Sequence, residues 1–597
     1  MKRGKDKKGL PFFGIPKLAP YLKPYKMLFF WMVVTGTVGS GMDAIIPLFQ
    51  QHAIDHFIAD KTMQGVGGWL ALYILVMIIQ TATNYISAYG ACKAELYIGR
   101  DLKRETFNHL QTLSFSYFNQ NSVGYTHARV MSDTDRIAST LAWGLMEAVW
   151  YIAYLLLAIV MMFVLNWKLA LCVMVIVPVL VISGAYFQKK LVFFHRRVRE
   201  QNSKITGAKT TKTLVIEDKV EQEFDDLTGE MKRLSVRAMH FRSVFMSTTA
   251  FAASIALAIV LWRGGVITRD GVILIGTLSV FMNYAQGMME PVQWLVQVMS
   301  SLVNVQVNVE RVTRLLETES DVSDTPEVTA KYGDAFHPKK ENWEPLYGDI
   351  EFQDVTFRYP DGSENVLEHF NLKVPQGTNV AIVGETGAGK STLVNLVCRF
   401  FEPTQGRILI DGRDARERSQ LWLHSNIGYV LQTPHLFSGT VLENLRYGRP
   451  DATMDEIEAA VKAVSADQII ARLPDGYNTD IGEGGNTLST GEKQLLSFAR
   501  ALLADPRIFV LDEATSSVDT VTERLIQDAI EKVMAGRTSF IIAHRLSTIR
   551  RADVILVVHG GKIIESGTHR SLMNAKGAYY QLYTHQYREE QTRSMMD

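Results

Sequence analysis

Six apolar stretches in the first half of the chain constrain its fold more than any other feature, because each is long enough to cross a lipid bilayer. A helix needs roughly 20 mostly apolar residues to cross the hydrocarbon core. The six stretches lie at 27–49, 69–91, 141–165, 169–187, 245–267 and 272–296. They predict an all-α membrane domain with six spans.

The loops between these stretches predict the topology. Spans two and three, and spans four and five, are joined by long segments rich in Lys and Arg, while the other loops are short or carry few basic residues. Basic loops stay in the cytoplasm, which also places the N-terminus and the second half of the chain there. The long loops keep a helical period, so we expect helices that continue into the cytoplasm and meet at two tips. One tip is a turn at Gly124 that leads into a short helix, and the other lies at 207–217.

Charge and cysteine content narrow the possible partners. The chain has 62 basic and 62 acidic residues and three widely spaced cysteines, so nothing indicates a nucleic-acid partner or a cysteine metal site. The basic N-terminal segment predicts a helix at the inner membrane surface, with Phe12, Phe13 and Leu18 facing lipid. Membrane lipid is therefore an expected partner.

Three acidic residues fall inside the apolar stretches: Asp43, Glu147 and Glu290. Ionised groups are costly in lipid, so we expect them to face a cavity or another helix. Asp43 and Glu290 are the better candidates for substrate contacts. The methionines near the sixth stretch are adaptable enough to line a cavity, but ordinary packing explains them at least as well.

A change in composition divides the chain. Residues 317–347 are polar, contain Pro and Gly, and show no sustained apolar period, which is typical of a boundary between domains. We therefore predict an N-terminal and interfacial segment at 1–26, a membrane domain at 27–316, a linker at 317–347 and a soluble α/β domain at 348–597.

The soluble domain contains a phosphate-binding loop. An apolar strand at 379–383 precedes the G-x-x-x-x-G-K-S pattern at 384–391, and a helical run follows. In this context the backbone N–H groups wrap phosphates, Lys390 reaches the terminal phosphates, and the Ser391 hydroxyl binds Mg²⁺.

A second acidic site follows the apolar strand at 507–511. Asp512 and Glu513 stand at its carboxyl end, where ligands of open α/β sheets bind. Asp512 suits the Mg²⁺ shell, and Glu513 suits a general base that polarises the attacking water.

With these motifs the chain resembles the half-transporters of the ABC exporter family, in which six spans precede one nucleotide-binding domain. Residues 488–492, LSTGE, resemble the family's LSGGQ signature. The resemblance covers nearly the whole chain and implies a P-loop ATPase domain with an antiparallel β subdomain and a helical signature subdomain. It also implies ATP and Mg²⁺ as cofactors, a second half-transporter as partner, and a bacterial cell membrane as the location.

The resemblance assigns site residues as well. The implied catalytic residues are Glu513, His544 and Gln432. The implied Mg²⁺ ligands are Ser391, Gln432 and Asp512. The implied nucleotide-binding residues are Tyr359, which stacks on adenine, and Gly384, Glu385, Thr386, Gly387, Ala388, Gly389, Lys390, Ser391, Thr392, Ser489, Gly491 and Asp519.

Two positions depart from the family's signature. Thr490 replaces a glycine, which restricts the backbone, and Glu492 replaces a glutamine, which adds negative charge near the phosphate. Glu513 and His544 match the family, so this combination resembles the catalytic half of heterodimeric exporters. A homodimer with two slightly altered sites stays open.

The expected function is ATP-driven export of a hydrophobic or amphiphilic compound, drug-like or lipid-like, by alternating access. The alternative from another class is an ATP-sensing regulatory or channel-like subunit in which binding, rather than turnover, carries the signal. An importer fits less well, because importers of the family generally keep spans and cassettes on separate chains.

Overall fold

The computed structural model describes residues 16–175, 217–512, 520–543 and 545–596, together with scattered positions between 178 and 197. The chain divides into two compact units. The membrane unit consists of Met1–Leu110 and Val123–Thr318, and the cassette unit consists of Gln111–Ser122 and Glu319–Asp597.

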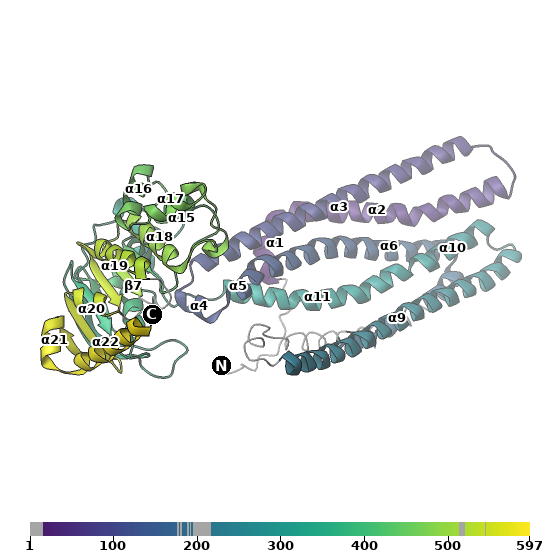
Figure 1. The fold of residues 1–597 in the computed structure, drawn as a ribbon. Coiled ribbons are helices and arrows are strands. Elements are labelled where there is room, and N and C mark those ends of the chain that lie inside the picture. The colour runs from purple at the N-terminus through teal and green to yellow at the C-terminus, as the bar shows by residue number, and fades with distance from the viewer. Residues whose placement is uncertain are drawn as a thin grey trace. The chain divides into compact units, whose positions relative to one another are not determined.

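Long helices make up the membrane unit (Figure 1). Among the residues that the structure describes, four helical segments are long and apolar enough to cross a membrane: Pro16–Ile58, Val66–Gln111, Val123–Met174 and Glu221–Arg269. The main helices are α2 (Lys26–His52), α3 (Val66–Gln111), α6 (Thr134–Met174), α9 (Glu217–Arg269), α10 (Ile275–Gly287) and α11 (Met289–Leu316).

The predicted sixth span differs from a single straight helix, whereas the break between the third and fourth spans falls within 166–168, where the sequence places it. The third span and the start of the fourth lie in α6, which is interrupted at Asn166 (φ −161°, ψ 104°). The Asn166 side chain accepts a hydrogen bond from the backbone N–H of Leu169 at 3.1 Å, as a cap of the following segment does. The sixth span is divided between α10 and α11. Pro291, in the first turn of α11, has no N–H to donate to the preceding turn, which explains the division.

The N-terminal segment differs from the prediction at Leu18. This side chain is only 1% exposed and belongs to a core cluster with residues of α3 and α11, including Ala94 and Val309, so it does not face lipid. Its apolar surface is buried more completely against these helices than it would be at a membrane surface. Phe12 and Phe13 lie outside the described residues.

The first cytoplasmic tip is built differently from the prediction. Gly124 lies inside the short helix α5 (Val123–Ala128), and another short helix, α4 (Phe115–Gln120), precedes it. The turn therefore lies at Asn121 and Ser122. The second predicted tip lies almost entirely outside the described residues.

Two sheets form the frame of the cassette unit. A six-stranded sheet has the order β10 (Lys562–Gly567), β9 (Val554–His559), β3 (Asn379–Val383), β8 (Thr538–Ile542), β7 (Ile508–Asp512), β6 (Ile427–Val430). All neighbours in it are parallel except β9 and β10. The second sheet is antiparallel, with the order β2 (Leu367–Val374), β1 (Ile350–Phe357), β4 (Gln405–Ile410), β5 (Arg413–Asp414).

The six-stranded sheet is buried on both faces. Along β3, Val380 and Ile382 belong to one core cluster, whereas Ala381 and Val383 belong to the other. Such continuous apolar strands are typical of parallel sheets covered by helices. The predicted fold class, a helical membrane domain followed by an α/β cassette with an antiparallel sheet, is confirmed.

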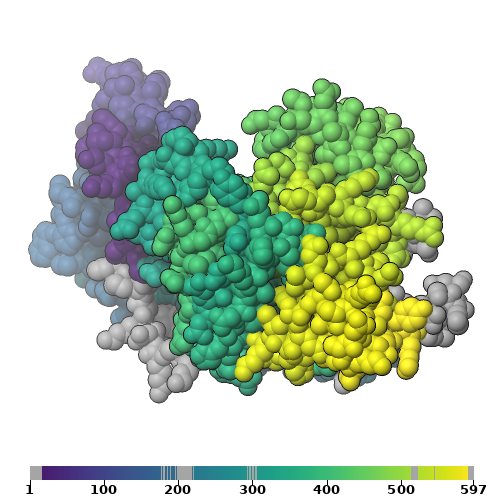
Figure 2. Space-filling model, turned by 90° about the vertical axis from the view of Figure 1, so that its left-hand side faces the viewer, coloured from purple at the N-terminus to yellow at the C-terminus, as the bar shows by residue number. Residues whose placement is uncertain are grey.

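Helices complete the cassette unit. The part between β6 and β7 is a helical subdomain, drawn in green in Figure 2. The helices are α12 (Pro326–Tyr332), α13 (Lys390–Val397), α14 (Gln420–Ser425), α15 (Val441–Arg446), α16 (Met454–Ala463), α17 (Asp467–Arg472), α18 (Thr490–Leu503), α19 (Thr520–Met534), α20 (Leu546–Arg551), α21 (His569–Ala575) and α22 (Ala578–Met596).

Candidate nucleotide site

The phosphate-binding loop lies between β3 and α13. Gly389 is the residue before the first turn of α13 and has φ +102°, where a side chain would be strained. At Gly384, which has φ +152°, a Cβ atom would meet the carbonyl oxygen of Val558 on β9. These two glycines let the loop turn tightly and bring its backbone N–H groups to the N-terminus of α13, where anions bind.

Lys390 lies inside this loop. Its Nζ donates hydrogen bonds to the carbonyl oxygens of Gly384 and Glu385, both at 2.8 Å. Burial lowers the pKa of the Lys390 amine, and the nearby Asp512 carboxylate opposes that shift. The amine is thus held in the centre of the loop, where a phosphate would exchange with the two carbonyl partners.

The other predicted loop residues divide by exposure. Ser391 is exposed on the first turn of α13, while Thr392 and Ala388 are buried. Exposure of Ser391 leaves its hydroxyl accessible to solvent, and its role as a Mg²⁺ ligand stays a prediction. The remaining exposed members of the loop are Glu385, Thr386 and Gly387.

Three sheet strands end at or just before other predicted site residues. Asp512 ends β7, Gln432 follows β6, and β8 ends just before His544. The strands are parallel neighbours in register, with Leu511 beside Val430 and Asp512 beside Ile542. Their carboxyl ends therefore meet at the same edge as the end of β3, where ligands of open α/β sheets bind.

The predicted Mg²⁺ ligands carry oxygen donors, and the elements that hold or precede them begin or end at this edge. The Ser391 hydroxyl, the Asp512 carboxylate and the Gln432 side-chain carbonyl are hard oxygen ligands of the kind that Mg²⁺ prefers. Glu513, Asp519 and His544 lie outside the described residues. Their roles remain predictions.

Tyr359 lies beside the phosphate-binding helix. Its hydroxyl and the Thr392 hydroxyl are 3.0 Å apart, and its ring packs edge-on against Phe357 and Phe401, with centroids 4.9 and 5.1 Å away. The half-buried ring is therefore held next to α13, and its stacking on adenine stays a prediction.

The signature residues begin α18. Ser489 caps this helix, and Glu492 completes a capping box: its carboxylate accepts from both the backbone N–H and the hydroxyl of Ser489 at 2.9 Å. Arg472, at the end of α17, lies 3.3 Å from the other carboxylate oxygen of Glu492. The motif S-x-x-E predicts the capping box from sequence, but nothing in the sequence indicates Arg472.

The sequence also does not indicate the stack between Phe115 and Phe400. Phe115 of α4 stacks on Phe400, with ring centroids 4.0 Å apart and planes inclined by 24°. Phe400 follows α13 closely in sequence and also contacts the rings of Tyr429 and His424. The short helix α4 is thus attached to the end of the phosphate-binding helix.

Inside the membrane unit, each of the three acidic residues accepts a hydrogen bond from an aromatic side chain. Asp43 accepts from Trp150 at 2.9 Å, and Glu147 accepts from Trp294 at 2.6 Å. Glu290 accepts from the Tyr151 hydroxyl at 3.1 Å, and the Tyr151 and Trp294 rings lie 5.3 Å apart. These contacts join α6 to α2 and α11, so the acidic residues face other helices, one of the two predicted environments.

The methionines near α10 match ordinary packing. Met288 is buried, and the half-buried Met282 packs against the same core cluster.

Comparisons with known proteins match both parts of the chain. Residues 29–292 match the ABC transporter transmembrane region, and residues 367–516 match the ABC transporter family. The uncharacterized ABC transporter ATP-binding protein YfiC of Bacillus subtilis is 34% identical over 98% of this chain and 95% of its own length. The putative multidrug export ATP-binding/permease protein YgaD of the same organism is 33% identical over 94% of this chain and 98% of its own. A putative multidrug export ATP-binding/permease protein of Staphylococcus aureus is 33% identical over 96% of this chain and 99% of its own.

Proposed function

The chain belongs to the ABC transporter family, with the transmembrane region and the ATPase in one polypeptide, and from this we propose that it exports a hydrophobic or amphiphilic compound by alternating access. It is a multi-pass protein of the cell membrane and an ATPase coupled to transport. Relatives named as multidrug exporters support a drug-like substrate, with Asp43 and Glu290 as candidate contacts.

One observation carries the catalytic part of the proposal: Lys390 and Ser391 lie in the phosphate-binding loop at the sheet edge where Asp512 ends β7. Lys390 would bind the terminal phosphates, and Ser391, Asp512 and Gln432 would hold Mg²⁺. The ion would neutralise charge on the phosphates. Glu513 would orient and deprotonate the attacking water, and His544 would hold the terminal phosphate.

The remaining predicted site residues would complete nucleotide binding. Tyr359 would stack on adenine, and the position of its ring beside α13 supports this role. Ser489, Gly491 and Asp519 would contact the nucleotide of an opposing subunit. The loop residues with backbone roles are Gly384, Glu385, Thr386, Gly387, Ala388 and Gly389, with Thr392 in the helix behind them.

Half-transporters of this family generally dimerise. We propose a heterodimer, because Thr490 and Glu492 alter this chain's signature while Glu513 and His544 match the family. The partner would supply an unaltered signature to the nucleotide on this chain. For the chain itself we propose the boundaries 1–26, 27–316, 317–347 and 348–597, and the division between the two units after Thr318 supports the end of the membrane domain near 316.

ATP would drive the cycle by binding the closed cassette dimer more tightly than the open one, since a ligand shifts an equilibrium only through such a difference. Closure would be transmitted through the cytoplasmic tips, and the stack between Phe115 and Phe400 supports this route for the first tip. Hydrolysis would then reset the cassettes.

The decisive variant is Glu513→Gln in the full-length assembled transporter. Loss of a general base typically lowers the rate by roughly 10²–10⁴-fold. We therefore expect ATP turnover and transport into inverted vesicles to fall together, while ATP binding persists. Unchanged turnover and transport in this variant would contradict the proposed mechanism. Unchanged transport with lost turnover would favour an ATP-sensing role.

A further inference from the structure

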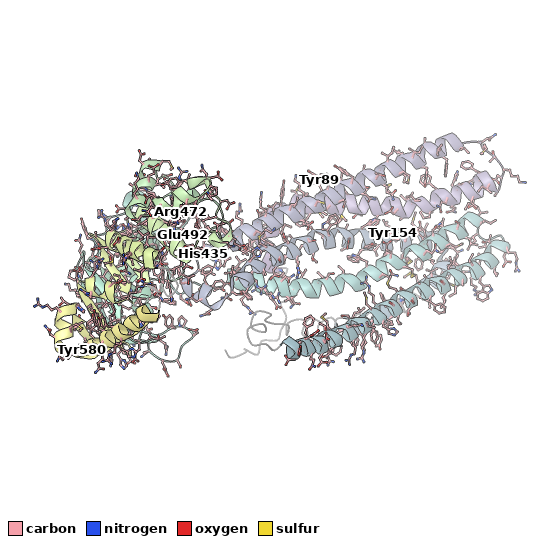
Figure 3. All side chains as sticks on the ribbon, viewed as in Figure 1. Tyr89, Tyr154, His435, Arg472, Glu492 and Tyr580 are labelled. Atoms are coloured by element: carbon pink, nitrogen blue, oxygen red, sulfur yellow. The ribbon has the colours of Figure 1, made fainter. Side chains whose placement is uncertain are left out.

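Arg472 and Glu492 lie together at the start of α18, on the helical subdomain (Figure 3). Nη2 of Arg472 donates to Oε1 of Glu492 at 3.3 Å, and Nε donates to the carbonyl oxygen of Gln468 at 3.1 Å. The Arg472 side chain is 71% exposed and that of Glu492 is 24% exposed. An ion pair this exposed contributes little to folding stability, so structural support alone is a weak explanation for it.

Glu492 changes what Ser489 can offer to a phosphate. A serine hydroxyl has one hydrogen to donate. Here that hydrogen is directed to Oε2 of Glu492, and Oγ of Ser489 accepts from the Glu492 backbone N–H at 3.3 Å. A glutamine in this place would keep one acceptor oxygen for Ser489, but it would carry no charge and would replace the second acceptor oxygen with a donor amide.

Glu492 also places a negative charge where a phosphate would bind. Helix N-termini attract anions through their unpaired N–H groups and the helix dipole. A carboxylate in the first turn competes for that attraction. The ion pair with Arg472 offsets this charge from a neighbouring helix, α17.

Arg472 keeps capacity for a further ligand. A guanidinium has five N–H groups in a planar fork, a geometry that matches phosphate. In the part of the chain that the structure describes, its hydrogen bonds use two of them.

We propose that Arg472 positions the terminal phosphate of a nucleoside triphosphate at this signature, neutralising Glu492 and donating where Ser489 does not. The inference rests on the proposed function, in which the signature receives a nucleotide bound by an opposing subunit. At the site formed by this signature and a nucleotide bound to the opposing subunit, the preference for ATP over ADP would then depend on Arg472, because ADP lacks the terminal phosphate.

The test is equilibrium binding of radiolabelled ATP to the assembled full-length transporter carrying Glu513→Gln, with ADP as competitor. A charge-assisted bond to phosphate changes affinity by roughly tenfold. Arg472→Ala should therefore weaken ATP binding by about tenfold at one class of site, while ADP binding and the melting temperature stay unchanged. Arg472→Lys should recover part of the loss, since it restores the charge but not the fork.

The same measurement in a Glu492→Gln background tests the coupling. There the negative charge that Arg472 neutralises is gone, so Arg472→Ala should weaken ATP binding less than it does beside Glu492. Arg551→Ala is the matched control, because it breaks another exposed ion pair of the cassette, 2.6 Å from Glu531. It should leave the ATP preference unchanged.

The inference would be overturned by an equal loss of ATP binding in both backgrounds, by an equal loss of ATP and ADP binding, or by the same loss in the Arg551 control. ATP turnover of the Glu513→Gln transporter distinguishes a failure of the proposed function from a failure of the present inference. If that variant still hydrolyses ATP normally, the proposed function fails. If it does not, and Arg472 has no effect on ATP preference, only the present inference fails.

Discussion

Lys390 shows how one residue prepares the nucleotide site before a nucleotide arrives. The amine is buried in the loop and hydrogen-bonded to two backbone carbonyls. Breaking a hydrogen bond to a neutral carbonyl costs less free energy than breaking one to a carboxylate, because a hydrogen bond to a charged acceptor is stronger. The amine can therefore move to a phosphate without breaking a buried ion pair.

The lowered pKa of Lys390 predicts how ATP affinity depends on pH. The amine is charged below its pKa and neutral above it, and only the charged form attracts phosphate. Because burial lowers this pKa, we expect ATP affinity to fall in the alkaline range at a lower pH than an exposed lysine would allow. Equilibrium ATP binding across that range, on the full-length protein, measures the effect.

Lys390→Arg provides the comparison, since a guanidinium stays charged throughout. The variant should bind ATP less well at neutral pH, because its larger head does not match the loop, but its affinity should not fall in the alkaline range. An equal alkaline loss in both proteins would show that another group is responsible.

At the scale of elements, α4 is the short helix that we expect to couple the cassette to the membrane helices. Six residues form this helix, and it belongs to the cassette unit although α3 precedes it and α5 follows it in the membrane unit. A helix this short is not stable alone. Its position depends on contacts such as the stack of Phe115 on Phe400.

Phe115→Ala should therefore reduce transport more than ATP hydrolysis. An aromatic pair contributes about 0.5–1.5 kcal/mol beyond the area it buries, which is enough to loosen α4 but not to unfold the cassette. We expect several-fold less substrate moved per ATP hydrolysed, measured in proteoliposomes with both rates followed in parallel.

Phe118→Ala is the matched control on the same helix, because its side chain is as exposed as that of Phe115 (46% against 48%) but its ring packs edge-on against Tyr117 rather than on Phe400. It should leave the ratio of transport to hydrolysis near that of the unaltered protein. The same fall in both variants would argue against a specific role of the stack.

At the scale of the whole molecule, the linker is part of the cassette rather than a free tether. Arg399, whose side chain is 4% exposed, donates to Asp324 at 2.9 Å, to Glu402 at 3.0 Å and to the carbonyl oxygen of Arg418 at 2.8 Å. Asp324 also accepts from the backbone N–H of Gln420. These hydrogen bonds attach the linker to the cassette at Asp324, a few residues after the division between the two units at Thr318.

Asp324→Ala should destabilise the cassette by about 1–3 kcal/mol, because it leaves a buried guanidinium and a backbone N–H short of an acceptor. Glu402 stays as a partner of Arg399, which keeps the loss below that of an isolated buried charge. Thermal unfolding of the full-length protein measures the shift. The exposed Asp321→Ala, three residues away, should have no effect, and equal shifts would contradict the argument.

The sequence predicts the features that repeat or that depend on neighbours in the chain. The apolar spans, the phosphate-binding loop between strand and helix, and the acidic residue ending β7 are of this kind. Features that depend on distant contacts were not predictable: the burial of Leu18 against α3 and α11, the attachment of α4 at Phe400, and the pairing of Arg472 with Glu492. Each requires knowing which helices lie side by side.

The attachment of α4 also has a consequence for biosynthesis. A ribosome releases Phe115 long before it makes Phe400, so the two halves of the stack cannot meet until most of the chain has been translated. Domains generally fold as they emerge, from the N-terminus onward. The newly inserted membrane helices must therefore wait with an exposed aromatic tip, and a chain that stops before Phe400 would present that tip to quality-control proteases.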